Sequence, residues 1–347
     1  MSIELKAITK KFGSLVANDS IDLKVARGEI HAILGENGAG KSTLMNIVYG
    51  LAKADSGKIF VEDKEVIINE PADALRYGIG MVHQHFMLIP VFTVAENIAL
   101  GREESRGVFL TLDEVKKKIK ALADEFKFDI DPDALIEDLP VGVQQRVEII
   151  KALIYDAKVL ILDEPTAVLT PQETDELLNI MRTLKKKGTS IIFITHKLRE
   201  VKDVADKITI IRLGKVVGTT SPDTSQEDLA SMMVGRQVDL APNKVEIKTG
   251  RVILDINKLN VANSLGRKII NSLSLQVKAG EILAIAGVQG NGQSELTRAI
   301  LNLEDHVQGS IKLDEQEILG LTVQDALRKG IAYIPESREL DGLIGTF

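Results

Sequence analysis

The chain has 347 residues, of which 44% are hydrophobic and 27% charged, enough for about two domains that each bury an apolar core. Its net charge of −7 disfavours a surface that coats nucleic acid, and the absence of cysteine excludes disulfides, thiolate metal sites and cysteine nucleophiles. The start lacks the apolar core of a signal peptide, and no run of roughly 18 apolar residues predicts a membrane span, so any membrane role needs a partner.

The first segment, residues 3–34, reads as short strands separated by polar turns, and the last of these strands covers residues 28–34. One turn carries Phe12. An aromatic face at this position is a stacking platform for a purine base, and the alternative is a partly buried core ring. Both interpretations of Phe12 stay open from the sequence.

Residues 35–43 then form the pattern of a phosphate-binding loop, with two glycines separated by four residues and followed by Lys and Ser. The glycines at 35, 38 and 40 allow a tight turn whose N–H groups point inward, where a side chain would block a polyphosphate. Lys41 would place a cation on the β- and γ-phosphates, and the Ser42 hydroxyl would ligate Mg²⁺. Apolar residues at helical spacing follow from Leu44 to Leu51, so the loop is predicted at a helix N-terminus, which favours anions.

Residues 57–61 are strand-like, residues 73–76 read as a short helix, and Met81-Val82 looks like the end of a strand. Gln84 lies just beyond that strand, where its amide oxygen could reach a metal ion or orient a water molecule. His83 and His85 resemble a pair of metal ligands, but no acidic or cysteine companion follows at zinc spacing, which favours surface contacts instead.

Residues 111–138 are charged and helical in pattern, with Thr111 and Glu114 spaced as a capping box. The stretch that begins at Leu139 opens a further helix. Residues 159–162 form a continuous apolar run, as expected for a parallel strand buried on both faces, and the run ends in Asp163-Glu164. Two adjacent carboxylates at that end cost desolvation free energy unless a cation or hydrogen bonds compensate.

Thr170, Pro171 and Glu173 mark another helix start, and the helix is expected to stop at Gly188. Residues 190–195 are the next strand. His196 at its tip faces the same sheet edge as the carboxylates, which favours a position near the phosphates over a purely structural role.

An internal repeat governs the domain organisation, because residues 277–296 match residues 25–44 at a constant offset of 252 (277 − 25). We therefore predict a first α/β domain at 1–236, a linker at 237–250 and a second copy at 251–347. The second copy replaces Lys41 by Gln293, which loses a charge-assisted bond to phosphate. It also has Glu295 for Thr43 and Glu336 for Gln84. Residue 347 corresponds to residue 95 (347 − 252), so this copy is expected to be truncated, without its acidic strand.

Together these motifs resemble the ATP-binding subunits of ABC transporters, in particular the double-domain ATPases of ribose, galactose and nucleoside importers. The resemblance implies a P-loop NTPase fold: a mixed α/β sheet flanked by helices, with an antiparallel β part and a helical subdomain, followed by an incomplete second copy. It implies ATP and Mg²⁺ as ligands. It implies that Ser42, Gln84 and Asp163 hold the metal ion. Glu164 is then the general base, and Lys41 and His196 assist catalysis. Phe12 would stack on the purine ring of the nucleotide. The loop residues that hold the nucleotide are Gly35, Glu36, Asn37, Gly38, Ala39, Gly40, Lys41, Ser42 and Thr43.

Two departures from the family pattern stand in the first domain. The usual Leu-Ser-Gly-Gly-Gln signature corresponds to Leu139 to Val143 here, without its serine and first glycine. The position in the family's D-loop that is normally aspartate is Thr170. Because such domains sandwich nucleotides head to tail, the altered signature is expected to face the altered loop with Gln293. The intact site would need a signature from the missing part of domain two or from another ATPase chain.

The resemblance implies a peripheral ATPase on the cytoplasmic face of the membrane that drives a permease and depends indirectly on an external binding protein or lipoprotein. The Leu-Pro-Val-Gly form of the signature and the loop residues 290–293 are most similar to purine-nucleoside importers, although a sugar importer is an alternative. Two further alternatives are a soluble double-domain ATPase acting on ribosomes or DNA, and a fragment that binds ATP without appreciable turnover. The first of these predicts a basic inter-domain arm and two intact sites, which the sequence lacks, so no nucleic-acid partner is expected.

Overall fold

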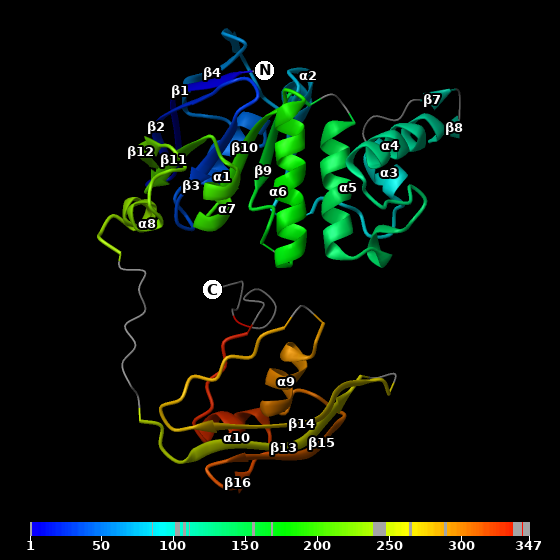
Figure 1. Cartoon of the computed structure of the whole chain (residues 1–347), viewed down its shortest axis with the longest axis vertical. Helices are drawn as coiled ribbons and strands as arrows, with labels where there is room; N and C mark the ends of the chain where they lie inside the picture. Colours follow the sequence, from blue (N-terminus) through cyan, green and yellow to red (C-terminus); the bar gives the residue numbers. More distant parts are fainter. Residues whose placement is uncertain are drawn as a thin grey trace. The chain divides into compact units, whose positions relative to one another are not determined.

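The computed structural model describes residues 2–84, 86–100, 105–106, 109–110, 112–154, 157–167, 169–238, 248–263, 266–287, 290–335 and 342. The chain divides into two compact units, residues 1–241 and 242–347, which are described separately below (Figure 1). The predicted linker at 237–250 spans this division. Its boundaries, and those of the two predicted domains, stay predictions.

The first unit begins with an antiparallel sheet in the order β2-β1-β4-β5. Its strands are β1 (Ile3–Phe12), β2 (Leu15–Val25), β4 (Ser56–Val61) and β5 (Lys64–Val66). Along β2 buried and exposed residues alternate, which puts Ile21, Leu23 and Val25 on the core face. Ile3 of β1 pairs with Val25 of β2 on one side and with Val61 of β4 on the other, so the register keeps one apolar face.

A second, six-stranded sheet runs in the order β12-β11-β3-β10-β9-β6. Its strands are β3 (Ile30–Leu34), β6 (Ile79–Val82), β9 (Val159–Asp163), β10 (Ser190–Thr195), β11 (Lys207–Arg212) and β12 (Lys215–Thr220). All neighbours are parallel except β11 and β12. The central strands are buried on both faces, which explains their continuous apolar runs.

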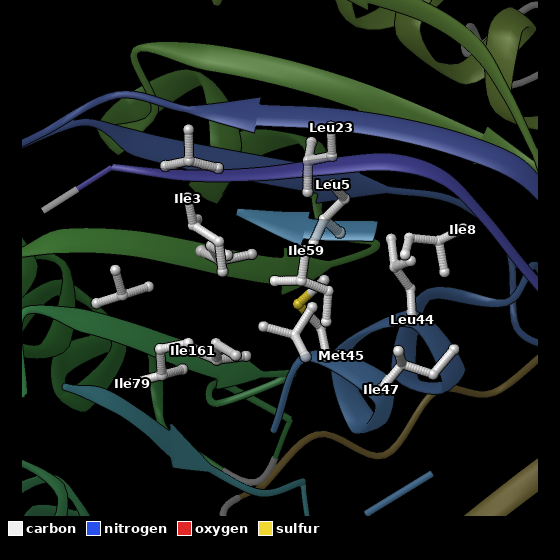
Figure 2. Close-up of a cluster of buried hydrophobic side chains, with 14 of the residues drawn as sticks. Ile3, Leu5, Ile8, Leu23, Leu44, Met45, Ile47, Ile59, Ile79 and Ile161 are labelled. Atoms are coloured by element: carbon white, nitrogen blue, oxygen red, sulfur yellow. The ribbon is translucent and has the colours of Figure 1, made fainter. Parts of the chain in front are cut away.

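The helix α1 (Lys41–Tyr49) lies between the two sheets. In the close-up, its Leu44, Met45 and Ile47 lie among apolar side chains of both sheets (Figure 2). The opposite face of the six-stranded sheet packs on apolar residues of α6 (Pro171–Lys186), α7 (Leu198–Val204) and α8 (Gln226–Val234). This layering leaves the carboxyl ends of the central strands as one edge of the sheet.

A helical subdomain with its own apolar cluster interrupts the chain between β6 and β9. Its elements are α3 (Val94–Ala99), β7 (Ser105–Arg106), β8 (Phe109–Leu110), α4 (Asp113–Phe126), the 3₁₀ turn η1 (Ile136–Asp138) and α5 (Val141–Leu153). The short helix α2 (Pro71–Arg76) precedes β6. The mixed sheet, antiparallel part and helical subdomain confirm the predicted fold class for this unit.

The prediction of a helical segment over residues 111–138 was wrong in its extent. The helix ends at Phe126 because Lys127 takes a left-handed conformation with φ 56° and its N–H turns back to the carbonyls of Ala123 and Asp124. Its N-cap is Leu112, and Thr111 lies outside the described residues. Acidic side chains in the first turn favour this start through the helix dipole.

The second unit contains a sheet in the order β14-β13-β15-β16 around an apolar cluster of its own. Its elements are β13 (Val252–Ala262), β14 (Lys268–Lys278), α9 (Gln293–Ile300), β15 (Val307–Leu313), β16 (Gln316–Glu317) and α10 (Val323–Arg328). Residues 282–286, which correspond to β3 at the repeat offset, form no strand, and Ile282 is 92% exposed. The interpretation of this unit as an incomplete second copy stays a prediction.

Within the described part of the chain, we find no helix whose length and apolar character would suffice to traverse a bilayer.

Candidate functional site

The carboxyl ends of four neighbouring strands carry the predicted site residues. Parallel register pairs Thr195 of β10 with Leu34 of β3, and Ile194 of β10 with Asp163 of β9. Because the strands run the same way, the loop after β3, the acidic end of β9, His196 after β10 and Gln84 after β6 meet at one edge. Ligands of open α/β sheets bind at such an edge.

The loop of residues 35–40 owes its glycines to more than one cause. Gly38 and Gly40 have φ of 81° and 98°, a region that side chains disfavour. At Gly40 a Cβ would also stand 2.2 Å from the Ala17 carbonyl oxygen, and at Gly35 it would stand 2.3 Å from that of Ile211. Close packing against the protein's own backbone therefore requires glycine at 35 and 40, in addition to the space that a polyphosphate would need.

Glu36, Asn37 and Ala39 complete the loop, and the Ala39 N–H donates to the Glu36 carbonyl at 3.1 Å. Gly40 is the N-cap of α1, without a side-chain cap, and Ser42 and Thr43 lie in the first turn. The uncapped N–H groups and the helix dipole at this end make an environment that favours an anion.

Lys41 is the first residue of α1 and is only 5% exposed. Its ammonium donates to the carbonyl oxygens of Gly35 at 2.8 Å and Glu36 at 2.9 Å, which ties the cation to its own loop. Burial lowers the pKa of Lys41, while the carboxylates of Glu164 and Asp163 act in the opposite direction.

Asp163 is 4% exposed, and its Oδ1 atom is buried without a hydrogen-bond partner. Burial raises the pKa of this carboxyl, and Glu164 adds to the rise, while the hydrogen bond from Ser42 and the charge of Lys41 lower it. A buried carboxylate oxygen without a partner is costly in free energy. It fits a divalent cation, because carboxylate and hydroxyl oxygens are the ligands that Mg²⁺ accepts.

Among the described residues, no group of three or more His, Cys, Asp or Glu side chains gathers as a metal site. A magnesium ion at Asp163 would therefore need further oxygens from Ser42, Gln84 or a bound phosphate. Nucleotide-dependent magnesium sites are built in this way, with one or two protein ligands and the rest from phosphate or water.

Glu164 lies beside Asp163 and meets two side chains from neighbouring strand ends. The Gln84 amide nitrogen donates to Glu164 Oε2 at 3.2 Å, and His196 Nδ1 lies 3.3 Å from Glu164 Oε1. Glu164 also has a left-handed backbone with φ 45°. Non-glycine residues in this region cluster at functional sites, where the surroundings fix the conformation.

Phe12 ends β1 and is 53% exposed, with the Lys10 ammonium 5.4 Å from its ring centroid. The adjacent strand β2 contacts the loop, because the Asn18 amide donates to the Gly40 carbonyl at 3.0 Å. The exposed ring disfavours the alternative of a core residue. The role of Phe12 in stacking on a purine base stays a prediction.

His83 packs edge-on against Tyr49, with 5.6 Å between the ring centroids. Burial and the nearby Lys151 cation lower its pKa, which favours the neutral imidazole. His85, the other member of the pair noted in the sequence, lies outside the described residues.

Comparison with known proteins identifies the family. The ABC transporter family model matches residues 18–167 and 270–344. A nucleoside import ATP-binding protein of Lactococcus lactis is 49% identical over 99% of this chain and 68% of its own length. The chain belongs to the ABC transporter family. A guanosine import ATP-binding protein of Bacillus subtilis is 47% identical over the same shares.

The ABC fold is also evident from solved structures. A dimeric ATP-binding cassette in a post-hydrolysis state with ADP and phosphate aligns with 64% of this chain and all of its own, with a TM-score of 0.55 and 25% identity. The family and the fold predicted from the motifs are thus confirmed, whereas the roles of the individual site residues stay predictions.

The altered ABC signature opens α5, with Pro140 at the N-cap and no side-chain cap. Gly142 of this segment sits against Glu173, because a Cβ there would lie 2.1 Å from the Glu173 carboxylate. Thr170, where the family pattern has aspartate, caps α6 by accepting from the Glu173 N–H. In the second unit, Gln293 opens α9 after Gly292 with φ 97°, much as Lys41 opens α1 after Gly40.

Four buried polar residues near this edge were missed in the sequence: Gln145, Glu148, Thr166 and Glu200. Their partners lie far away in the sequence; Thr166, for example, bonds to Glu200 across 34 residues. A usable signal existed at Glu200, which stands four residues before the buried Val204 and hence on the inner face of its helix.

Proposed function

We propose that this chain is the ATP-hydrolysing motor subunit of a nucleoside importer, with simple sugars as the alternative cargo. The observation that carries the proposal is the meeting of Lys41, Asp163, Glu164 and the uncapped start of α1 at one sheet edge. The names of the two import relatives support nucleosides over sugars.

The loop of residues 35–40, the first turn of α1 with Ser42 and Thr43, and the Lys41 ammonium would bind the phosphates of ATP. Lys41 would exchange its bonds to the Gly35 and Glu36 carbonyls for phosphate oxygens. Ser42, Asp163 and Gln84 would hold Mg²⁺, whose contribution when bound is to neutralise charge on the phosphate oxygens. The unpartnered Asp163 oxygen supports this assignment.

Glu164 would accept a proton from the water that attacks the terminal phosphate. Gln84 and His196 each contact one oxygen of its carboxylate, which restricts the rotation of the side chain. His196 presents its other ring nitrogen away from Glu164, where it could donate to a phosphate oxygen. Positioning and charge thus account for the chemistry, as phosphoryl transfer to water requires.

In this proposal the chain acts on the cytoplasmic face of the membrane, on permease subunits supplied by other chains and indirectly on an external binding protein. Residues 251–347 correspond to a second ABC domain in this proposal, and the signature that completes the ATP sandwich comes from outside the described residues or from another ATPase chain. The dimeric cassette with ADP and phosphate supports the assembly of two such domains.

Substitution of Glu164 by Gln tests the proposed chemistry. The variant should bind Mg·ATP in calorimetry with little change in affinity, while phosphate release falls by about 10²- to 10⁴-fold, the usual contribution of a general base. Glu227→Gln on the exposed side of α8 is the matched control and should behave as wild type. Near-normal hydrolysis by Glu164→Gln would remove Glu164 as the base, and no heat with Mg·ATP from wild type would remove the motor itself.

Lys41→Ala should weaken ATP binding by roughly tenfold or more, because a charge-assisted contact contributes about 1.5–3 kcal/mol. A binding titration measures this, with Lys215→Ala on the exposed strand β12 as control.

If wild type binds ATP but releases no phosphate, the chain is a nucleotide-binding module. Uptake of labelled guanosine and ribose by cells lacking the gene would then separate nucleoside from sugar transport.

A further inference from the structure

The turn directly after Glu164 is fixed by buried side chains from elements far away in the sequence. A left-handed conformation at Glu164 is unfavourable for a residue with a Cβ atom, and it persists only where surrounding contacts determine it. The Glu164 N–H donates to the Ile194 carbonyl at 3.0 Å, and Pro165 and Thr166, which follow Glu164, are both buried.

The first contact comes from Glu200 on α7, which is 5% exposed. Its Oε2 atom accepts from the Thr166 hydroxyl at 2.8 Å and from the Thr195 hydroxyl at 3.4 Å. Thr195 is the last residue of β10 and directly precedes His196. A single buried carboxylate therefore joins the segment that carries Glu164 to the segment that carries His196.

Lys197 strengthens the same connection. Its ammonium donates to the Thr166 carbonyl at 2.7 Å and lies 3.3 Å from Glu200 Oε1, so both oxygens of Glu200 have partners. The Lys197 N–H also donates to the Thr195 hydroxyl at 3.1 Å. These bonds make a small network in which Thr166, Thr195 and Glu200 hold one another at fixed distances.

The second contact comes from the helical subdomain. The amide of Gln145, on α5 and 2% exposed, donates to the Pro165 carbonyl. Pro165 and Thr166 are thus held by two helices, α5 and α7. At a buried position, apolar packing often stabilises the fold as much as a carboxylate with its partners, or more. The placement of Glu200 is better explained by the geometry it imposes.

We propose that Glu200 is a positioning residue for ATP hydrolysis, which fixes Glu164 relative to His196 through Thr166 and Thr195, with Gln145 as a second anchor. The inference rests on the proposed function of Glu164 and adds residues that touch neither nucleotide nor metal. Loss of the network should change the orientation of the Glu164 carboxylate without changing the loop that binds the phosphates.

Thr166→Val is the most direct test, because it removes the hydroxyl bond to Glu200 and keeps the shape of the side chain. The expected result is a fall in kcat of about 10- to 100-fold, the size of effect that a small misplacement of a catalytic group produces, with KM for ATP within about threefold. Thr166→Ser keeps the hydroxyl and should restore most of the rate. Thr183→Val, at an exposed position of α6, is the matched control.

A double-mutant cycle separates positioning from a merely structural role. If Glu200 and Thr166 act through Glu164, then Thr166→Val should not lower the residual rate of Glu164→Gln any further. A fall that multiplies on top of the Glu164→Gln effect would overturn the inference, as would an unchanged kcat in Thr166→Val.

A readout independent of turnover covers the case in which wild type does not hydrolyse ATP, which would count against the proposed function alone. The ring resonances of His196, assigned by His196→Gln among the five histidines, should move in Thr166→Val and stay in Thr166→Ser and Thr183→Val. Unchanged His196 resonances in Thr166→Val would overturn the inference.

Discussion

At the scale of single residues, the site gathers charges that burial makes costly and that a bound ligand would relieve. Burial lowers the pKa of Lys41 and raises that of Asp163, so both groups are less easily ionised than in water. The sequence predicted which side chains reach this edge, because each follows a strand. It did not predict that Lys41 binds its own loop carbonyls, since that bond depends on the path of the loop.

Asp163→Asn should stabilise the nucleotide-free protein at neutral pH. A raised pKa means that the ionised carboxyl destabilises the fold; this penalty is absent below the unfolded-state pKa and complete above the folded-state pKa. Removal of the charge should therefore raise Tm at neutral pH, by about 2–4 °C for each kcal/mol. The gain should shrink as the pH falls through the pKa of the folded-state carboxyl.

Thermal melting over a range of pH measures this effect, with the exposed Asp129→Asn as control. The same variant should lose the dependence of ATP affinity on magnesium. A lower Tm for Asp163→Asn at neutral pH would contradict the assignment of Asp163 as a destabilising buried charge.

At the scale of helices and strands, local patterns were predicted well where the deciding contacts are local. The box formed by Thr170 and Glu173 was confirmed, because the bonds that define it lie within four residues. The spacing of Thr111 and Glu114 fits a capping box equally well, but Thr111 lies outside the described residues, and the helix has Leu112 at its N-cap. Gln145 and Glu200 were missed for the opposite reason, since their bonds depend on how separate helices pack.

Thr170→Ala should destabilise the chain by about 0.5–2 kcal/mol through the loss of the α6 cap. The Thr170 hydroxyl accepts from the Glu173 N–H and donates to the Glu173 carboxylate. Urea unfolding gives the free energy, and Thr170→Ser, which keeps the hydroxyl, should stay close to wild type. An unchanged midpoint for Thr170→Ala would show that packing alone holds the start of α6.

At the scale of the whole molecule, each apolar cluster draws its residues from one unit, three in the first and one in the second. The internal repeat predicted a second sheet of similar order, and β14-β13-β15-β16 has the connectivity of β2-β1-β4-β5. Residues 282–286, the counterpart of β3 at the repeat offset, form no strand. In the first unit β3 pairs with β10 and β11, and the described residues of the second unit contain no strand that corresponds to either.

Residues 1–238 alone should fold and bind Mg·ATP with the affinity of the full chain, because the three clusters and all proposed nucleotide contacts lie within them. Calorimetry and thermal melting of this fragment test the expectation. A fragment that melts without cooperativity would show that the second unit is needed for the first to fold. A fragment that folds but binds ATP more than about tenfold more weakly, a loss of about 1.4 kcal/mol, would show that the second unit contributes to binding.

The loop glycines have a consequence for mutational scans. At Gly35 and Gly40 an added methyl group would collide with the Ile211 and Ala17 carbonyls, whereas at Gly38 it would meet no atom within 4 Å. Alanine at the first two positions would thus disturb folding whether or not a ligand is present, and inactive variants there say little about recognition. Alanine at Gly38 carries only backbone strain, of order 1 kcal/mol, which makes it the informative position for a loss of affinity.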